Sequence, residues 1–512
     1  MVETVQEREN ILQEIQTAIR HMAVYGVGNL LVKALGFFML PFYTHYLGPT
    51  DYGILEILDL SMTLVSLVLN MGLTPAFLRC YAATGSAEEK RTFVATGCLF
   101  GFTTGLATMA LGVAFIRPIT HLIFGHGVPA SYVLLSFLAL ALNYIALLPR
   151  TYLRALEASG MYVTFDTIGV FALLFLNIFF IAVMKLGIAG VLWSSFIVAA
   201  VQCVGFSIWA AIKTGIRFHM PHLRRILGFG LPLILSNIGL FVLNFSDRFF
   251  LQHLRSLEVV GVYAVGYKFG FMMNYLMVQP FFTMWQTRMY AIHARPDHRA
   301  IFRHIFSLYS FFLIYAGLAM CLFGSEALRL MAEQKFWGGA AVIPVVILSY
   351  VFYGLSYYAQ LGLLLTDRTK QVGAAGACAA GLCLIFNYFL IKSFGMMGAA
   401  WATALSFLSL AAISYVLSQR AFPLQLGLGR MGAALATAAA MFIVCHLLKP
   451  GNPFLAIGLK CISLAAFPAV LWKTGIMPAG TAAVLAAGWN KVVGKVAKLR
   501  PLAARRGATE AL

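Results

Sequence analysis

A few charged side chains lie inside long apolar stretches of this 512-residue chain, and their chemistry requires a partner. Lys33 lies near the middle of the first stretch. Glu56 and Asp59 lie in the second, three residues apart and therefore on one helix face. Lys268 lies in a later stretch. A charge inside hydrocarbon costs at least about 2.5–3.5 kcal/mol, so each of these groups needs a counter-charge or a wet cavity.

Two interpretations of these charges remain open. In the first, Lys33 and Asp59 form a buried ion pair that fixes the register of two helices. In the second, the charges line a polar cavity whose cations bind an anionic substrate. Further polar residues on the second stretch and on the later one favour the cavity: Arg79, Tyr267, Asn274, Gln279 and Arg288.

Other residue types narrow the chemistry. Asp247 and Arg248 are adjacent at the outer end of another apolar stretch, where we expect them to act as a gate or interface pair. The eight Cys and eleven His show no metal-site spacing, and the sequence has no phosphate-binding glycine loop, H-E-x-x-H motif or nucleophile elbow. The sequence therefore predicts no metal, no cofactor and no enzymatic activity.

The composition places these charges in a membrane protein. Hydrophobic residues make up 61% of the chain and charged residues 11%, with a mean hydropathy of +0.85. A soluble domain carries about 25% charged residues. In a soluble protein the net charge of +19 would indicate nucleic acid. Here we expect the excess Lys and Arg to lie in cytoplasmic loops, and no nucleic-acid partner.

The apolar runs predict an all-α integral membrane protein with about fourteen transmembrane helices. Each run is long enough to cross ~30 Å of hydrocarbon. The predicted spans are 23–44, 53–78, 93–116, 129–149, 163–184, 188–211, 226–246, 259–286, 304–323, 341–365, 371–391, 396–418, 430–448 and 453–472.

The distribution of Lys and Arg predicts the orientation. With the N-terminus inside, the cytoplasmic segments hold about three times as many Lys and Arg as the outer ones. An even number of spans then places both termini in the cytoplasm. Residues 1–22 are predicted to be amphipathic and not a cleaved signal peptide. Residues 476–512 are predicted to form a basic tail on the inner membrane surface.

An internal repeat divides the chain. A spacing of 208 residues relates Gly53 to Gly261 and the Gly-x-x-Gly-x-x-Trp motif at Gly187 to the one at Gly395, and it places the turn 156–160 on 364–368. Such halves are parallel repeats, and transporters built this way bind substrate between them. The predicted domains are an N-terminal segment (1–22), an N-terminal six-helix bundle (23–211), a basic linker (212–225), a C-terminal six-helix bundle (226–418), two additional helices (419–475) and the tail (476–512).

Several segments, in their order and spacing, resemble the polysaccharide transporter family, the Wzx-type oligosaccharide flippases. The opening of that family is similar to Leu40-Pro-Phe-Tyr-Thr-His-Tyr-Leu-Gly-Pro-Thr-Asp-Tyr-Gly53. The start of its second half, and its sixth and twelfth helix starts, are similar to Leu231–Ser236, Ser246–Phe250, Gly261–Lys268, Lys185–Gly190 and Gly395–Ala402.

The resemblance implies the fold of the multidrug/oligosaccharidyl-lipid/polysaccharide exporter superfamily, with two six-helix bundles around a central cavity that works by alternating access. It also implies a polyprenyl-diphosphate-linked oligosaccharide as cargo, carried from the cytoplasmic to the outer leaflet of a bacterial inner membrane. A diphosphate in low dielectric needs compensating charge. We expect Lys33 and Lys268 to supply it first, and Arg79 and Arg288 second. The acidic pair of the second span then contacts sugar hydroxyls or carries a coupling ion, H+ or Na+.

Alternatives to this function remain. A peptidoglycan lipid-precursor flippase has similar chemistry, and a cation-coupled drug antiporter of the same superfamily would need an acidic pocket. A membrane enzyme would need an activated acid, base or nucleophile. Besides its cargo, the expected partners are membrane lipids and other polysaccharide-assembly membrane proteins.

Overall fold

The computed structural model describes residues 37, 39–230, 233–424, 426–448 and 451–477, and these residues form helices joined by turns and loops, with no strand among them. The chain divides into two compact units. Unit 1 comprises Met1–Tyr267, Ala327–Val342 and Gly376–Ser406, and unit 2 comprises Lys268–Glu326, Ile343–Ala375 and Phe407–Leu512.

Unit 1 contains the helices of the first half of the chain and the beginning of the second. They are α2 (Leu40–Tyr46), α3 (Pro49–Asn70), α4 (Leu73–Ala82), α5 (Ala87–Ala114), α6 (Ile116–Phe124), α7 (Ala130–Ala155), α8 (Ser159–Ile178), η1 (Phe179–Val183), α9 (Ile188–Thr214), α10 (Met220–Gly230), α11 (Leu233–Leu254), α12 (Leu257–Met273) as far as Tyr267, η3 (Gln334–Val342) and the middle of α17 (Thr369–Ala421).

Unit 2 contains most of the remaining helices. They are η2 (Asn274–Val278), α13 (Gln279–His293), most of α14 (His298–Met331), α15 (Ile343–Ala359), α16 (Leu361–Leu365), the two ends of α17, α18 (Leu428–Leu448) and α19 (Pro453–Lys473).

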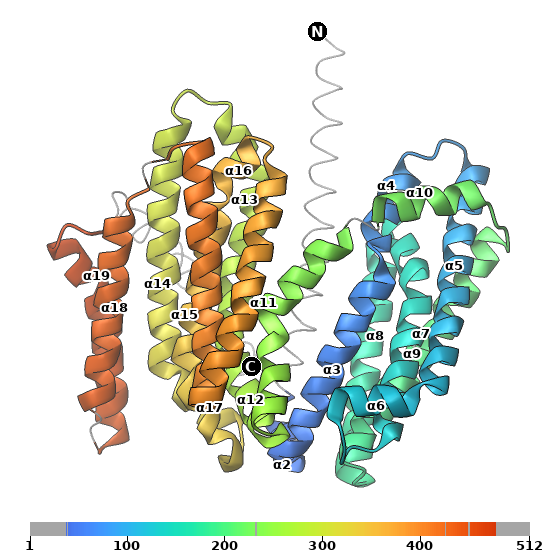
Figure 1. Cartoon of the computed structure of the whole chain (residues 1–512), viewed down its shortest axis with the longest axis horizontal. Coiled ribbons are helices and arrows are strands. Elements are labelled where there is room, and N and C mark those ends of the chain that lie inside the picture. The colour runs from blue at the N-terminus through green and yellow to red at the C-terminus, as the bar shows by residue number, and fades with distance from the viewer. Residues whose placement is uncertain (1–36, 38, 231–232, 425, 449–450, 478–512) are drawn as a thin grey trace, which may run out of the picture. The chain divides into compact units, whose positions relative to one another are not determined.

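Helix α7 lies at the centre of the first bundle, where it packs against α3, α5, α8 and α9 (Figure 1). Its side chains Tyr144 and Leu148 pack with residues of α4 and α5. Ile145 and Leu153, on another side, pack with residues of α9. A helix that is apolar on several sides is typical of the interior of a bundle.

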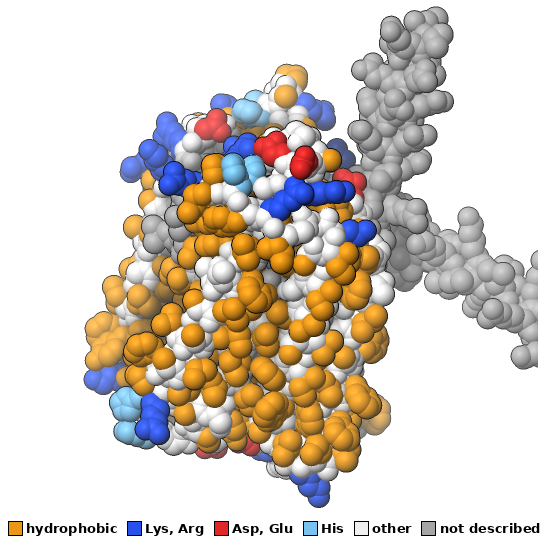
Figure 2. Space-filling model, turned by 90° about the vertical axis from the view of Figure 1, so that its right-hand side faces the viewer, with side chains coloured by type: hydrophobic (Ala, Val, Ile, Leu, Met, Phe, Trp, Pro, Cys, Tyr) orange, Lys and Arg blue, Asp and Glu red, His pale blue; other side chains and the backbone are white. Residues whose placement is uncertain are grey.

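The expectation of a multi-pass membrane protein is confirmed. Among the described residues, ten helices are long and apolar enough to cross a membrane. On the face shown in Figure 2, hydrophobic side chains form a broad band, and charged side chains gather at its two ends. In the first bundle, Phe175, Val201 and Ile212 are each more than 65% exposed. Lipid is the solvent that such a surface requires.

At three places the predicted spans do not correspond one to one to the ten apolar helices. The predicted span 23–44 lies mostly outside the described residues. The spans 371–391 and 396–418 are the two helical parts of α17, separated by the non-helical conformation of Gly395. The spans 226–246 and 259–286 correspond to α11 and α12–α13, which are not among the ten apolar helices. The count of fourteen therefore stays a prediction.

Backbone conformation supports the internal repeat. Gly187 precedes α9 with φ 56° and ψ −130°, and Gly395 forms the kink of α17 with φ 57° and ψ −131°. Both are left-handed conformations that favour glycine. The turns 156–160 and 364–368 depart from the spacing of 208 residues. Their left-handed residues are Glu157 and Asp367, each with φ 55°. These two residues lie 210 positions apart, so the second half has two residues more between Gly261 and this turn and two fewer between the turn and Gly395.

Candidate functional site

Helices α3 and α12 approach each other closely at two glycines. A Cβ atom on Gly53 would lie 1.9 Å from the carbonyl oxygen of Leu257, and one on Gly261 would lie 1.9 Å from that of Pro49. Pro49 and Leu257 are separated by the same 208 residues as Gly53 and Gly261. Each half of the chain therefore contributes the same glycine and the same carbonyl to a symmetric crossing.

Polar side chains and one main-chain carbonyl, that of Asn244, surround Arg248 of α11, and these residues are here named the Arg248 cluster. Its members are Glu56, Asn244, Asp247, Arg248, Tyr263, Tyr267 and Thr403. Arg248 and Asp247 are each 2% exposed. Arg248 Nη1 donates hydrogen bonds to Asp247 Oδ1 at 2.7 Å and to the Asn244 carbonyl at 2.8 Å. The guanidinium carbon lies 3.8 Å from the centre of the Tyr267 ring.

The carboxylates of the cluster have different surroundings. Asp247 Oδ2 accepts hydrogen bonds from the Tyr263 hydroxyl at 2.5 Å and from the Thr403 hydroxyl at 3.4 Å. Glu56 Oε1 lies 3.7 Å from Arg248 Nε, a buried nitrogen that has no hydrogen-bond partner within the described chain. The Glu56 side chain is 15% exposed. One guanidinium thus faces two carboxylates, and Glu56 is the carboxylate with access to solvent.

The position of Asp247 and Arg248 corrects the sequence prediction. They were expected to close the end of a helix, but α11 continues to Leu254 and both side chains are buried inside the cluster. The structure allows this because Glu56 and the aromatic ring of Tyr267 compensate the buried guanidinium.

The other predicted residues are distributed over several elements. Glu56 and Tyr267 belong to the Arg248 cluster. Asp59 of α3 and Lys268 of α12 are exposed, and each makes an interaction. Arg79 of α4 is exposed, with its guanidinium 4.4 Å from the centre of the Phe229 ring. Lys33 lies outside the described residues, so its predicted pairing with Asp59 stays a prediction.

Three residues that were predicted to line the cavity lie on η2 and α13 in unit 2. Asn274 is buried, and its Oδ1 has no hydrogen-bond partner in the described part of the chain. Gln279 and Arg288 are exposed. Gln279 belongs to a polar side of α13 whose other exposed members are Thr283, Gln286 and Tyr290, whereas Arg288, nine residues further on, lies on the opposite side. A third side is buried and carries Trp285 and Met289.

Sequence reasoning did not assign Asn244, Tyr263 or Thr403 to a site. The adjacent charges Asp247 and Arg248 were the usable signal for α11, because Asn244 contributes a main-chain carbonyl that any residue type offers. Thr403 lies in α17 and reaches Asp247 across 156 positions of the chain. Local spacing carried no signal for that contact.

A titratable contact joins α2 to the segment before η3. His45 Nδ1 lies 2.7 Å from Glu333 Oε1, and Lys335 Nζ donates to the His45 carbonyl at 3.4 Å. The hydrogen bond from His45, together with the charges of His45 and Lys335, lowers the pKa of Glu333 below its usual value of 4.5. Tyr52 and Phe336 pack beside this contact with ring centres 5.6 Å apart.

Comparison with known proteins gives the family. Residues 18–285 match the family described as polysaccharide biosynthesis protein. A protein of the Lsg locus of Haemophilus influenzae is 26% identical over 247 residues, which cover 48% of this chain and 59% of that relative. The chain thus aligns with less than two thirds of the length of that relative.

Comparison with solved structures gives the fold. The lipid II flippase MurJ in an inward closed conformation matches with a TM-score of 0.71 at 13% identity, over 89% of this chain and 100% of that chain. An inward-facing multidrug resistance MATE family transporter of the MOP superfamily matches with a TM-score of 0.61 at 14% identity, over 78% of this chain and 94% of that chain. The expected exporter fold is confirmed. Because the family match covers more than half of the sequence, the chain belongs to the polysaccharide biosynthesis protein family and has the fold of the MOP exporter superfamily.

Proposed function

We propose that this protein is a flippase that carries a polyprenyl-diphosphate-linked oligosaccharide from the cytoplasmic to the outer leaflet of a bacterial inner membrane. The product would serve O-antigen, capsule or exopolysaccharide synthesis. Both termini are cytoplasmic in this proposal, and other polysaccharide-assembly membrane proteins are its partners. The family and the fold, which are those of membrane transporters, support this proposal.

The observation that carries the proposal is the polar side of α13. Exposed Gln and Thr side chains are costly against lipid, so a membrane helix turns such a side toward a water-filled cavity or protein. Gln279, Thr283 and Gln286 offer amide and hydroxyl groups that hydrogen-bond sugar hydroxyls. In the proposal this side binds the oligosaccharide, and Asn274 contributes its unpartnered oxygen.

Cations bind the diphosphate in the proposed mechanism. Lys268 follows Tyr267 directly in α12 and is exposed. Together with Lys33 it compensates the phosphate charge, because a diphosphate leaving water needs opposite charge close by. Arg79 and Arg288 are exposed cations that meet the diphosphate as it enters from the cytoplasmic headgroup level.

Alternating access requires the bundles 23–211 and 226–418 to move against each other. In the proposal, the crossing of Gly53 and Gly261 is the place where the two halves stay in contact while one side of the cavity is closed. The excess carboxylate of the Arg248 cluster, Glu56, or the exposed Asp59 carries the coupling ion, H+ or Na+.

The test is transport into vesicles that contain the purified full chain. Three cargoes are compared: a fluorescent polyprenyl-diphosphate oligosaccharide, fluorescent lipid II and a cationic dye. Protein-dependent movement of the oligosaccharide carrier above both others is the expected result. Faster movement of lipid II would contradict the proposal and indicate a peptidoglycan-precursor flippase. Movement of the dye alone would also contradict it and indicate a drug antiporter. Imposed H+ and Na+ gradients in the same vesicles identify the coupling ion.

A further inference from the structure

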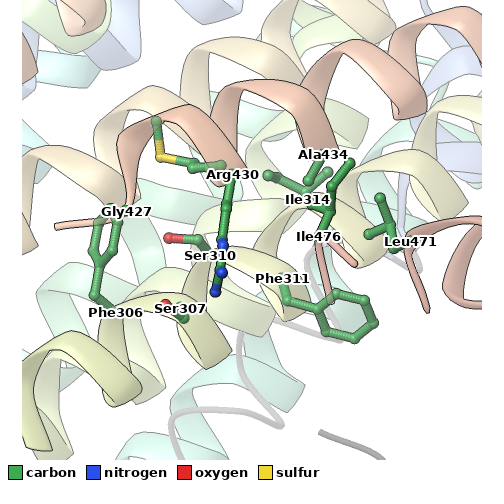
Figure 3. Close-up of a pocket in the computed structure, with 11 residues that line it drawn as sticks. Phe306, Ser307, Ser310, Phe311, Ile314, Gly427, Arg430, Ala434, Leu471 and Ile476 are labelled. Carbon is green, nitrogen blue, oxygen red and sulfur yellow. The ribbon is translucent and has the colours of Figure 1, made fainter. Parts of the chain in front are cut away.

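A narrow slot lies in unit 2 between α14, α18 and the end of α19 (Figure 3). Its polar end is formed by Ser307, Ser310 and Arg430, and its apolar walls include Phe311, Ile314 and Leu471. None of these residues belongs to the Arg248 cluster or to the polar side of α13.

The polar end contains hydrogen-bonding capacity that the described protein does not use. Ser310 is 3% exposed, and its Oγ is buried without a hydrogen-bond partner in the described chain. Figure 3 shows the Arg430 side chain running from α18 toward Ser310 and Ser307. A buried hydroxyl without a partner costs free energy that a bound ligand would recover.

The charges at this end select an anion. Arg430 lies in the first turn of α18, a helix of 21 residues, and Gly427 directly before the helix also lines the slot. The N-terminus of a long helix carries a partial positive charge and free N–H donors. No acidic residue is among the described residues that line the slot. A guanidinium, two hydroxyls and a helix N-terminus together match the oxygens of a phosphate group.

The position of the slot indicates a lipid. Helix α18 begins and α19 ends beside it, and α19 closes with Trp472, which is 72% exposed, and Lys473. Exposed Trp and Lys at helix ends are typical of the headgroup level of a bilayer. The slot has room for about two water molecules. Phosphate oxygens can enter this space, whereas a sugar cannot.

We propose that the slot binds the phosphodiester group of an anionic phospholipid of the adjacent leaflet. Arg430, Ser310 and Ser307 bind the phosphate oxygens, and the acyl chains stay in the bilayer outside the slot, because Phe311 and Ile314 are buried. The bound lipid holds α18 against α14, so the two additional helices are attached to the bundle through a lipid as well as through side chains. This site is independent of the cargo and of the transport function.

Native mass spectrometry of the purified full chain tests the proposal. The protein in detergent is titrated with phosphatidylglycerol, and the occupancy of the tightest bound lipid is measured. Arg430→Gln should weaken this binding about tenfold, because a charge-assisted hydrogen bond is lost, and Ser310→Ala about fivefold. Arg420→Gln is the matched control, since it removes the same charge from an exposed arginine that does not line the slot.

The sources of the phosphate group are separated in the same titration. Retention of phosphatidylglycerol by the native chain and the Arg420 variant, and its loss in the Arg430 and Ser310 variants, supports the site. Equal retention by all four proteins overturns it, as does an equal loss in both arginine variants. Displacement of the lipid by millimolar inorganic phosphate, or equal binding of phosphatidylcholine, overturns the assignment to an anionic lipid. Preferential retention of polyprenyl phosphate would assign the slot to a carrier lipid and also overturn it.

Discussion

Arg248 Nε in α11 lies 3.7 Å from Glu56 Oε1 in α3. The pair joins a helix of the first repeat to a helix of the second, and Glu56 lies one turn after Gly53, where α3 crosses α12. A buried guanidinium adds little stability through its ion pairs, but its carboxylates depend on it for compensation. The interactions of Arg248 therefore bear on both the folding of unit 1 and the contact between the repeats.

Removing Arg248 should destabilise the protein strongly. We expect Arg248→Ala to lower the free energy of unfolding by about 3–5 kcal/mol, because Asp247 stays buried without its cation. Denaturant unfolding of the purified protein in detergent measures the effect. Arg329→Ala, which removes an exposed arginine of the same unit, should cost under about 1 kcal/mol. Equal stability of the two variants would show that the cluster does not depend on Arg248.

Two tyrosines in the cluster provide a matched comparison. Tyr263→Phe removes a hydrogen bond of 2.5 Å to the Asp247 carboxylate and should cost about 1.5–3 kcal/mol. Tyr267→Phe removes one of 3.3 Å to the Asn244 carbonyl and keeps the ring over Arg248, so it should cost about 1 kcal/mol or less. The midpoints of thermal unfolding rank the two variants. The opposite ranking would contradict the hydrogen-bond assignment.

The glycine crossing should not accept a methyl group. Gly53→Ala or Gly261→Ala would place a Cβ 1.9 Å from a carbonyl oxygen, so the helices must separate at a cost of about 1–3 kcal/mol. Both variants should show the same loss of stability and of transport, because the contact is symmetric. Gly205→Ala in α9 is the control, since open space surrounds that position. Full transport with alanine at both crossing positions would rule out the crossing as a required contact.

The contact of α2 with Glu333 should depend on pH. The pKa of Glu333 is lowered by its hydrogen bond to His45, so the contact is stabilised at neutral pH and weakens as the pH falls below 4.5. Spin labels at Tyr46→Cys and Gln334→Cys, both at exposed positions, report the separation of the two segments. The distance distribution should broaden in acid. Adding Glu333→Gln should remove this pH dependence, and an unchanged acid response in that variant would contradict the assignment.

The helical class and the repeat could be predicted because each depends on local information. The length of an apolar run determines whether a helix can cross a membrane, and Gly187 and Gly395 mark equivalent turns through their backbone conformation. The same spacing identified Gly53 and Gly261 as equivalents. It could not show that they face each other, because the direction of helix packing is not encoded in the spacing.

Which residues form the site was harder to predict from the sequence. Glu56 and Arg248 were both recognised as unusual charges, but they were assigned to different tasks, since 192 positions separate them in the sequence. Asp247 and Arg248 resembled a helix end because charged residues usually stop a membrane span. Only the packed structure supplies Tyr263, Thr403 and Glu56, which allow those charges to lie inside a helix.

Transport of a fluorescent polyprenyl-diphosphate oligosaccharide into vesicles tests the central claim most directly. Native protein, Lys268→Ala and Lys392→Ala are compared at equal reconstitution, the last as a control that removes an exposed lysine elsewhere on the chain. The proposal predicts protein-dependent transport that Lys392→Ala keeps and Lys268→Ala reduces at least about tenfold, because a charge-assisted contact to phosphate is lost. No transport by the native protein would contradict the flippase function. Equal transport by all three would keep that function and remove Lys268 from the diphosphate site.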